Sequence, residues 1–551
     1  MTRHVAVIGG GSSGLACIKC CLDEGLEPVC FEGSDDIGGL WRFKENPEPD
    51  RASIYHSVTI NSSKEMMCYS DFPIPAHFPN YMHNSLVMDY FHMYADRFQL
   101  TKHIRFNTKV LQVTQRSDFS HSGQWDVETE NKDGEKEKHI FDAVMICIGR
   151  HCRPNLPLHD FPGIDTFKGK YFHSRDYKTP EEWRDKKVVV LGIGNSGADI
   201  AVELSRVTKQ LYLSTRRGAW IANRVSDNGL PRDMLNNRMT DFVRRILPFE
   251  LLCSVAERKV NQRFDHSLYN LKPKYRLLRQ HPTQSDELPN RILSGTIQVK
   301  HNIRRFQGSS VEFADGSVVE DVDLVVFATG YRFSFPFLDS HVASVSENKA
   351  SLYKYVFPPE LDHPTLAIIG LVQPLGASMP ISEMQARWAT RVFKGSVKLP
   401  SVASMLKDAQ CKQETMAKRY ITSHKHPILV DVSYMDEIAE LVGVQPNFLR
   451  LLLTDPRLGL NLLLGPSTSY QYRLRGPEKW DGARKAILTQ WERVAQPMQT
   501  RPCYGPKPKR SFVWSLILSA VAVGSAAYNL PAFLQDPTAL LDKIKVYLSA
   551  Q

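Results

Sequence analysis

Two sets of glycines have the spacing that holds the pyrophosphate of a dinucleotide. They are Gly9, Gly11 and Gly14, and Gly192, Gly194 and Gly197. In such a motif the first glycine permits a tight turn, the second lets the main chain approach the pyrophosphate, and the third lets a helix pack closely on a strand. The N–H groups at the start of that helix attract the anion. The sequence therefore predicts two dinucleotide sites.

Such glycines are specific only between a strand and a helix, and both sets have that context. The expected elements are strands at 4–8, 27–32, 187–191 and 210–215 and helices at 15–24 and 198–207. Two further strands, 143–148 and 323–328, end at glycines and mark where the chain crosses between the two units. The expected fold class is α/β, with two Rossmann-like dinucleotide-binding domains.

The ends of the second strands distinguish the two ligands. Glu32 ends the first of them, where a carboxylate accepts hydrogen bonds from ribose hydroxyls and repels a 2′-phosphate. At the second, Arg216 follows Ser214 and Thr215, which offers hydroxyl and guanidinium donors to a phosphate. The first site is therefore expected to take FAD and the second NADPH. The alternative for Arg216 is an ordinary surface charge.

The composition excludes several other classes of protein. With 551 residues, 42% of them hydrophobic and 23% charged, the chain is long enough for more than one core. The net charge of +10 comes without a basic stretch interleaved with aromatics, so nucleic acid is not an expected partner. Cys17, Cys20 and Cys21 give a CxxC spacing, but their position within a helix favours packing over redox chemistry.

An uncharged segment near the C-terminus has the length of a bilayer span. Residues 511–530 would extend about 30 Å as a helix, and Lys507, Lys509 and Arg510 precede them, as expected on the cytosolic side. We expect a membrane-inserted helix there, with a buried terminal helix as the alternative. Residues 531–551 have the helical spacing of an amphipathic, interfacial tail.

The chain is expected to return to the first unit through a strand at 366–369 and a helix from about Glu383 to Phe393. The whole organisation then has six parts. They are the first part of the FAD-binding domain (1–154), the NADPH-binding domain (155–330) with a helical insertion at about 220–291, the second part of the FAD-binding domain (331–445), a C-terminal helical region and linker (446–510), the membrane helix (511–530) and the tail (531–551).

The segment between the two glycine sets resembles a family signature. Residues 167–177 match the FxGxxxHxxxY pattern of the flavin-containing monooxygenases, and the resemblance extends through 38–41, 61–67, 327–331 and 373–376. Residues 263–266, 271–274 and 286–291 are most similar to isoform five of the mammalian enzymes. The residues after Arg501 depart from the family, a patchwork that would fit an engineered or reconstructed sequence.

This resemblance implies a reaction and a set of site residues. FAD and NADPH are the implied cofactors, no metal is implied, and a C4a-(hydro)peroxyflavin passes oxygen from O2 to a small lipophilic carbonyl, sulfide or amine. Asn61 is the implied catalytic residue, with capping of a helix at 62–65 as the alternative. The implied FAD set is Gly9, Gly10, Gly11, Ser12, Ser13, Gly14, Glu32, Gly39, Leu40, Trp41, Asn61, Ser62 and Gln373. The implied NADPH set is Gly192, Gly194, Asn195, Ser196, Gly197, Thr215 and Arg216.

The preferred substrate depends on the protonation of the peroxide. A deprotonated peroxide attacks carbonyls, as in Baeyer-Villiger oxidation of ketones and aldehydes to esters, whereas a protonated one oxygenates sulfur or nitrogen. Isoform five is associated with ketone oxidation, which favours the Baeyer-Villiger reaction with S- and N-oxygenation of xenobiotics beside it. Tyr177, in place of the Trp or Pro of dedicated Baeyer-Villiger enzymes, argues against that separate class.

Three other interpretations stay open. They are a mainly heteroatom-directed oxygenase, an NADPH oxidase that releases H2O2, and a disulfide reductase, which would need a cysteine pair facing the flavin. The anchor and the resemblance together predict the endoplasmic reticulum membrane, with the catalytic domains facing the cytosol. A homodimer is compatible with both.

Overall fold

The computed structural model describes residues 3–502 except Asp50, Asp227, Ser340, Ser344, Glu347, Leu375, residues 422–428 and Asp431. Residues 1–498 form one compact unit, and residues 499–551 form a second. The predicted membrane helix at 511–530 and the tail at 531–551 lie outside the described residues. Among the residues that are described, no helix combines the length and the apolar character needed to span a bilayer.

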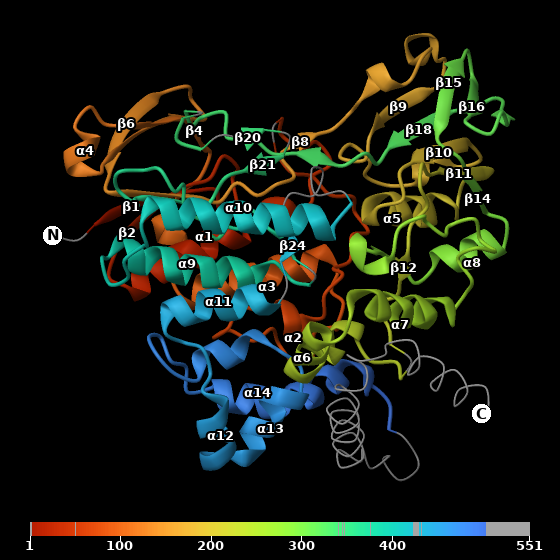
Figure 1. The fold of residues 1–551 in the computed structure, drawn as a ribbon. Coiled ribbons are helices and arrows are strands. Elements are labelled where there is room, and N and C mark those ends of the chain that lie inside the picture. Colours follow the sequence, from red (N-terminus) through yellow and green to blue (C-terminus); the bar gives the residue numbers. More distant parts are fainter. Residues whose placement is uncertain are drawn as a thin grey trace. The chain divides into compact units, whose positions relative to one another are not determined.

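The first sheet contains the first glycine motif and is parallel, with the strand order β22-β7-β1-β2-β3. Its strands are β1 (His4–Ile8), β2 (Glu27–Phe31), β3 (Ile104–Arg105), β7 (Ala143–Ile146) and β22 (Leu366–Ile368). Strands β1 and β2 are labelled beside α1 (Ser12–Asp23) in Figure 1. Val5, Ala6 and Val7 are completely buried, because both faces of this parallel sheet are covered by other elements. The predicted return of the chain at 366–369 is confirmed, since β22 pairs with β7.

Two helices of this sheet begin earlier than the sequence suggests. Helix α1 (Ser12–Asp23) begins directly after Gly11 and packs against α9 (Met379–Phe393). The prediction that α9 begins at about Glu383 is wrong by one turn. Pro380 lies in that extra turn, where a missing N–H costs nothing because the first N–H groups of a helix have no partner within it.

The second sheet contains the second glycine motif and is also parallel, with the order β14-β11-β10-β18-β9. Its strands are β9 (Lys170–His173), β10 (Lys187–Leu191), β11 (Gln210–Ser214), β14 (Ile297–Lys300) and β18 (Leu324–Phe327). Helix α5 (Asn195–Leu204) begins directly after Gly194, contains Gly197 and packs on β10 and β11. Both predicted strand-turn-helix-strand units are therefore present.

The two passages of the chain between the sheets run beside each other. The strands β8 (Arg153–Pro154) and β19 (Tyr331–Arg332) lie just after the predicted crossing points and pair antiparallel. Gly149 and Gly330 precede them with φ of +72° and +82°, a conformation that glycine adopts readily. This pairing ties the exit from the first sheet to the return from the second.

The insertion expected at about 220–291 contains helices, but it begins with a short strand. It opens with β12 (Ile221–Ala222) and closes near β13 (Thr283–Gln284), and these two strands pair with each other. Between them lie α6 (Arg238–Ile246) and α7 (Phe249–Asn261), and α8 (Leu288–Leu293) follows. The insertion therefore leaves the NADPH-binding part of the chain and returns to it at one place.

The remaining elements surround these sheets. The strands are β4 (Thr108–Gln115), β5 (Trp125–Asn131) and β6 (Lys136–Phe141), β15 (Ile303–Gln307), β16 (Ser310–Phe313) and β17 (Val318–Val319), and the pairs β20 (Val345–Ser346) with β21 (Lys349–Ala350) and β23 (Gln373–Pro374) with β24 (Leu429–Val430). The helices are α2 (Lys64–Met67), α3 (Asn84–Arg97), α4 (Phe119–Ser122), α10 (Val402–Arg419), α11 (Val432–Val442), α12 (Phe448–Thr454), α13 (Pro456–Leu464) and α14 (Ala483–Ala495).

Candidate active site

The first glycine turn connects β1 to α1 without room for a side chain. Gly9 has a φ of +103°, and its N–H donates to the carbonyl of Phe31 at 2.9 Å. A Cβ placed on Gly14 would lie 1.9 Å from the carbonyl oxygen of Gly9. The third glycine of the motif is therefore required by the packing of α1 on the turn.

The start of α1 lacks a side-chain cap. Its N-cap residue is Gly11, and the hydroxyl of Ser13 points away to donate to Ser382 Oγ of α9 at 3.0 Å. The first N–H groups of a helix have no partner within it, so those of α1, which begins at Ser12, are left for a ligand. This arrangement fits a bound pyrophosphate.

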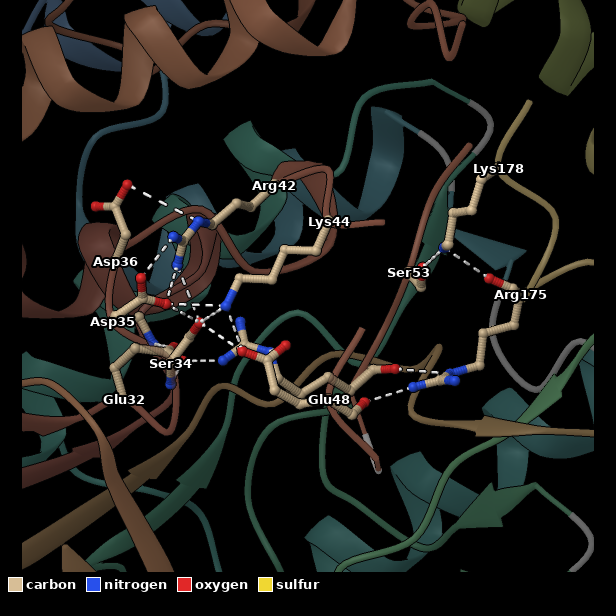
Figure 2. Close-up of polar contacts among 12 residues, drawn as sticks. Glu32, Ser34, Asp35, Asp36, Arg42, Lys44, Glu48, Ser53, Arg175 and Lys178 are labelled. Atoms are coloured by element: carbon tan, nitrogen blue, oxygen red, sulfur yellow. Dashed lines mark hydrogen bonds and ion pairs between the residues drawn. The ribbon is translucent and has the colours of Figure 1, made fainter. Parts of the chain in front are cut away.

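Glu32 lies just beyond the end of β2 and is buried beside the glycine turn. Its carboxylate accepts the N–H of Gly10 at 2.6 Å and pairs with Arg51. It also accepts the N–H of Ser34 at 2.8 Å (Figure 2). The predicted ribose-binding carboxylate is thus held at the tip of the first sheet. Ligand hydroxyls would share it with Arg51.

Two other predicted FAD segments reach the same edge of the sheet. Gly39, Leu40 and Trp41 form one short turn, and the preceding Gly38 donates its N–H to the carbonyl of Gly10 at 3.1 Å. Gln373 lies in β23, a few residues after β22 ends. The structure therefore brings these segments to the carboxyl ends of the parallel strands, where α/β sheets bind ligands.

Asn61 does not cap a helix, so that alternative is wrong. Helix α2 begins at Lys64 with Ser63 as its N-cap residue, and Asn61 and Ser62 precede it. The side-chain oxygen of Asn61 instead accepts a hydrogen bond from Arg224 Nε at 2.9 Å. Asn61 is therefore held by a residue of the insertion.

The second glycine turn repeats the geometry of the first. Gly192 has a φ of +109°, and a Cβ on Gly197 would lie 2.1 Å from its carbonyl oxygen. Gly194 is the N-cap residue of α5 and again provides no side-chain cap. A Cβ on Gly194 would meet no atom of the described chain within 4 Å, so the fold itself does not require glycine there. A closely approaching pyrophosphate does require it.

The other predicted NADPH residues surround this turn. Asn195 and Ser196 open α5, and Asn195 Oδ1 accepts the N–H of Gln284 at 2.9 Å. Thr215 Oγ1 accepts the N–H of Gly218 at 3.1 Å, which shapes the turn that follows β11. The guanidinium of Arg216 is exposed and makes no hydrogen bond or ion pair with a residue that the structure describes. Arg216 thus has the freedom that phosphate binding requires.

The signature segment connects the two cofactor regions. The spacing of the signature residues alone does not predict this connection. Arg175 donates to the carbonyl of Glu48 at 2.5 Å (Figure 2) and to that of Arg51 at 3.0 Å. Lys178 donates to the carbonyl of Ile54 at 3.2 Å. Neither Arg175 nor Lys178 is one of the residues that the signature specifies. Together they hold the segment that carries Arg51 against Glu32.

Two residues that the signature specifies, His173 and Tyr177, contact the elements around the second sheet. The ring of His173 contacts the carbonyl of Gly330 through Nε2 at 2.9 Å, and the hydroxyl of Tyr177 donates to Glu203 on α5 at 3.0 Å. Arg224 gives no signal in the sequence, because its partner Asn61 lies 163 residues away. Contacts between residues so far apart in the sequence are determined by the tertiary structure.

The cysteines near the first turn are packing residues, as the sequence indicates. Cys17, Cys20 and Cys21 are free thiols with no more than 1% of their surface exposed. Burial raises the pKa of all three thiols. A thiol that stays protonated is a poor nucleophile, which speaks against the disulfide reductase interpretation.

Comparison with known proteins assigns the family. The model of the flavin-binding monooxygenase-like family matches residues 2–529. The chain belongs to this family. The resemblance seen in the signature is confirmed, and the expectation that the residues after Arg501 depart from the family is wrong for those up to 529.

Curated relatives of this monooxygenase support the same family. Flavin-containing monooxygenase 5 of Oryctolagus cuniculus is 60% identical over 501 residues, which cover 91% of this chain and 94% of the relative. The Homo sapiens protein of the same name is 58% identical over the same length. Dimethylaniline monooxygenase [N-oxide-forming] 2 of Rattus norvegicus is 50% identical over 503 residues, 91% of this chain and 94% of the relative.

Solved structures show the same fold at lower identity. The S-allyl-L-cysteine S-oxygenase of Allium sativum aligns with a TM-score of 0.62 and 24% identity, over 90% of this chain and 99% of that one. A cyclohexanone-bound cyclohexanone monooxygenase aligns with a TM-score of 0.58 and 16% identity, over 80% and 98%. These structures show the fold alone. The family match and the curated relatives show that the chain is an NADPH-dependent oxidoreductase that uses FAD and NADPH.

Proposed function

We propose that this monooxygenase prefers carbonyl substrates and converts ketones and aldehydes to esters by Baeyer-Villiger oxidation. The observation that carries the proposal is the higher identity to proteins named flavin-containing monooxygenase 5, at 58–60%, than to the N-oxide-forming dimethylaniline monooxygenases 2, at 49–50%. The association of isoform five with ketone oxidation then supports the carbonyl class.

The proposed roles of the site residues follow from the two turns. FAD is bound by the uncapped start of α1, the Glu32 carboxylate and the segment from Gly39 to Trp41. Gln373 lies near the flavin. The uncapped start of α5, with the residues around it, binds NADPH. FAD supplies the oxygen-activating chemistry when bound. The chain orients the two cofactors, excludes water and offers the Asn61 amide as a hydrogen-bonding group.

S- or N-oxygenation is the second candidate function. The observation that favours it is the 49–50% identity to relatives whose printed name describes N-oxide formation. Release of H2O2 is the third, because any of these enzymes becomes an NADPH oxidase when oxygen is reduced without a substrate being oxygenated. The substrates of the two oxygenase candidates are small and lipophilic.

Product analysis under ¹⁸O2 tests this proposal. The holoenzyme, offered an aliphatic ketone and a thioether together with NADPH, should form an ester that carries one labelled oxygen as its main product. Sulfoxide as the sole labelled product would contradict the carbonyl preference. If H2O2 matched the NADPH consumed with both substrates present, the oxidase interpretation would hold instead.

Arg216 is proposed to bind the 2′-phosphate of NADPH. Replacing Arg216 with alanine should raise the KM for NADPH about tenfold or more and leave the KM for NADH nearly unchanged, because a guanidinium–phosphate contact is lost only with the phosphate-bearing cofactor. Steady-state kinetics with both cofactors measure this. Arg217→Ala is the matched control, since it removes the neighbouring charge. Equal losses with NADPH and NADH would refute the role of Arg216.

The remaining sequence-based assignments are part of the same proposal. The division of the chain into FAD-binding parts at 1–154 and 331–445 and an NADPH-binding part at 155–330 is supported by the two parallel sheets. Attachment to the endoplasmic reticulum membrane through 511–530 is supported by the composition of that segment. A homodimer is also proposed, because it is compatible with the membrane anchor and with the family.

A further inference from the structure

One arginine determines which end of the Asn61 side chain faces a ligand. Arg224 Nε donates to Asn61 Oδ1 at 2.9 Å. A guanidinium carries only donors, so the amide must turn its oxygen toward Arg224 and its NH2 group away. The Asn61 Nδ2 group makes no hydrogen bond with a residue that the structure describes. The donor end of the amide is therefore the end available to a ligand.

Arg224 is itself held on several sides. Its main-chain N–H donates to Asp286 Oδ1 at 3.2 Å, and its carbonyl accepts the hydroxyl of Tyr81 at 2.6 Å. Its guanidinium lies 3.7 Å from a carboxylate oxygen of Asp199 and 3.6 Å from one of Asp286. Only 16% of the Arg224 side chain is exposed. These contacts leave the guanidinium little freedom to turn away from Asn61.

The insertion holds the Asn61 segment at a second point. Asp233, in the short turn Arg232–Leu235, accepts the main-chain N–H of Ser63 through Oδ2 at 2.6 Å. The side chain of Asn61 and the main chain two residues later are thus both bound by residues of the insertion. A paired attachment of this kind restrains position as well as orientation.

We propose that Arg224 is a positioning residue that presents Asn61 as a hydrogen-bond donor toward the flavin. The inference rests on the proposed role of Asn61. Asp199 lies on α5, the helix of the second glycine motif, and it also accepts the hydroxyl of Tyr55 at 2.8 Å. Arg224 therefore connects the helix of the NADPH site to the amide on the flavin side. The competing account is that Arg224 only neutralises Asp199 and Asp286.

Arg224→Met in the FAD-loaded enzyme separates these accounts. We expect the substrate oxygenated per NADPH consumed to fall roughly tenfold, as for the loss of one hydrogen bond, with H2O2 making up the difference. The absorbance spectrum of bound oxidised FAD should shift as it does in Asn61→Ala. Arg263→Met is the matched control, because Arg263 lies 3.7 Å from the same Asp286 and donates to the Asp286 carbonyl rather than to Asn61. The control should preserve both the ratio of substrate oxygenated to NADPH consumed and the flavin spectrum.

The double variant Arg224→Met with Asn61→Ala decides whether the two residues act together. If Arg224 acts through Asn61, the double variant is no worse than the more affected single variant. Effects that multiply would overturn the proposal. Arg224→Lys retains the charge beside both aspartates but lacks Nε, so it should fold and still show the lower ratio. A normal ratio in Arg224→Lys would overturn the role assigned to the Nε donor.

Failure of the Asn61 role and failure of the Arg224 role give different results. If Asn61→Ala leaves the ratio and the spectrum unchanged, the role of Asn61 is wrong and the positioning role falls with it. If Asn61→Ala lowers the ratio and Arg224→Met does not, only the positioning role is overturned. Asn61→Asp keeps an acceptor for Arg224 but has no NH2 group, and it should behave like Asn61→Ala.

Discussion

Gly14→Ala should yield a protein that purifies with little flavin. The new Cβ would lie 1.9 Å from the carbonyl oxygen of Gly9, and a backbone atom in a tight turn cannot move aside as a flexible side chain can. Overpacking of this kind costs about 1–3 kcal/mol or more. It acts at the start of α1, where the pyrophosphate of FAD is proposed to bind. We expect the flavin content to fall to roughly a tenth or less of the wild-type value, measured by absorbance after denaturation.

Gly33→Ala is the matched control for this change. Gly33 lies next to Glu32 and is exposed, and a Cβ added there would have no atom of the described chain within 4 Å. The control should therefore keep its flavin and its melting temperature. A Gly14→Ala protein with a full complement of FAD would contradict the close packing of α1 on the Gly9 turn.

Gly197→Ala should keep its FAD and lose reduction by NADPH. A Cβ on Gly197 would lie 2.1 Å from the carbonyl oxygen of Gly192, so the start of α5 must shift. A misplacement of about 1 Å at a binding element can lower a rate by about a hundredfold. Anaerobic mixing with NADPH and observation of flavin bleaching measures this rate. Reduction at the wild-type rate would refute the assignment of the second turn.

Gly194→Ala tests whether glycine at this position is required by the fold or by the bound ligand. Its Cβ would meet no atom of the described chain within 4 Å, so the variant should fold and melt like the wild type. It should nevertheless bind NADPH more weakly, because the added methyl group occupies the space through which the pyrophosphate approaches the main chain. Equal affinities for NADPH in Gly194→Ala and wild type would show that this glycine has no role in binding.

Much of the fold can be predicted from local patterns. The strands β1 and β10 have the bounds that the sequence predicts, because a short apolar run before a glycine turn is a strong local signal. The helices are predicted less accurately. Both α1 and α5 begin three residues earlier than expected, since the glycines and serines at their starts are typical of turns but adopt helical geometry here. Pro380 similarly obscures the start of α9.

The sequence by itself determined the two glycine turns, the carboxylate at the end of one strand and the arginine at the end of the other. These features depend on residues close together in the chain, where the chirality of the backbone and the strand-turn-helix pattern leave few alternatives. The same locality explains why the family could be recognised from its signature.

Only the tertiary structure decided how these parts are joined. The pairing of Glu32 with Arg51, the contacts of Arg175 with the 48–51 segment and the contact between Arg224 and Asn61 connect residues that are distant or unpatterned in the sequence. Such contacts form only after the sheets and the insertion have packed, and no local spacing encodes them. The orientation of the Asn61 amide is therefore a property of the folded chain, because the donor that sets it lies 163 residues away.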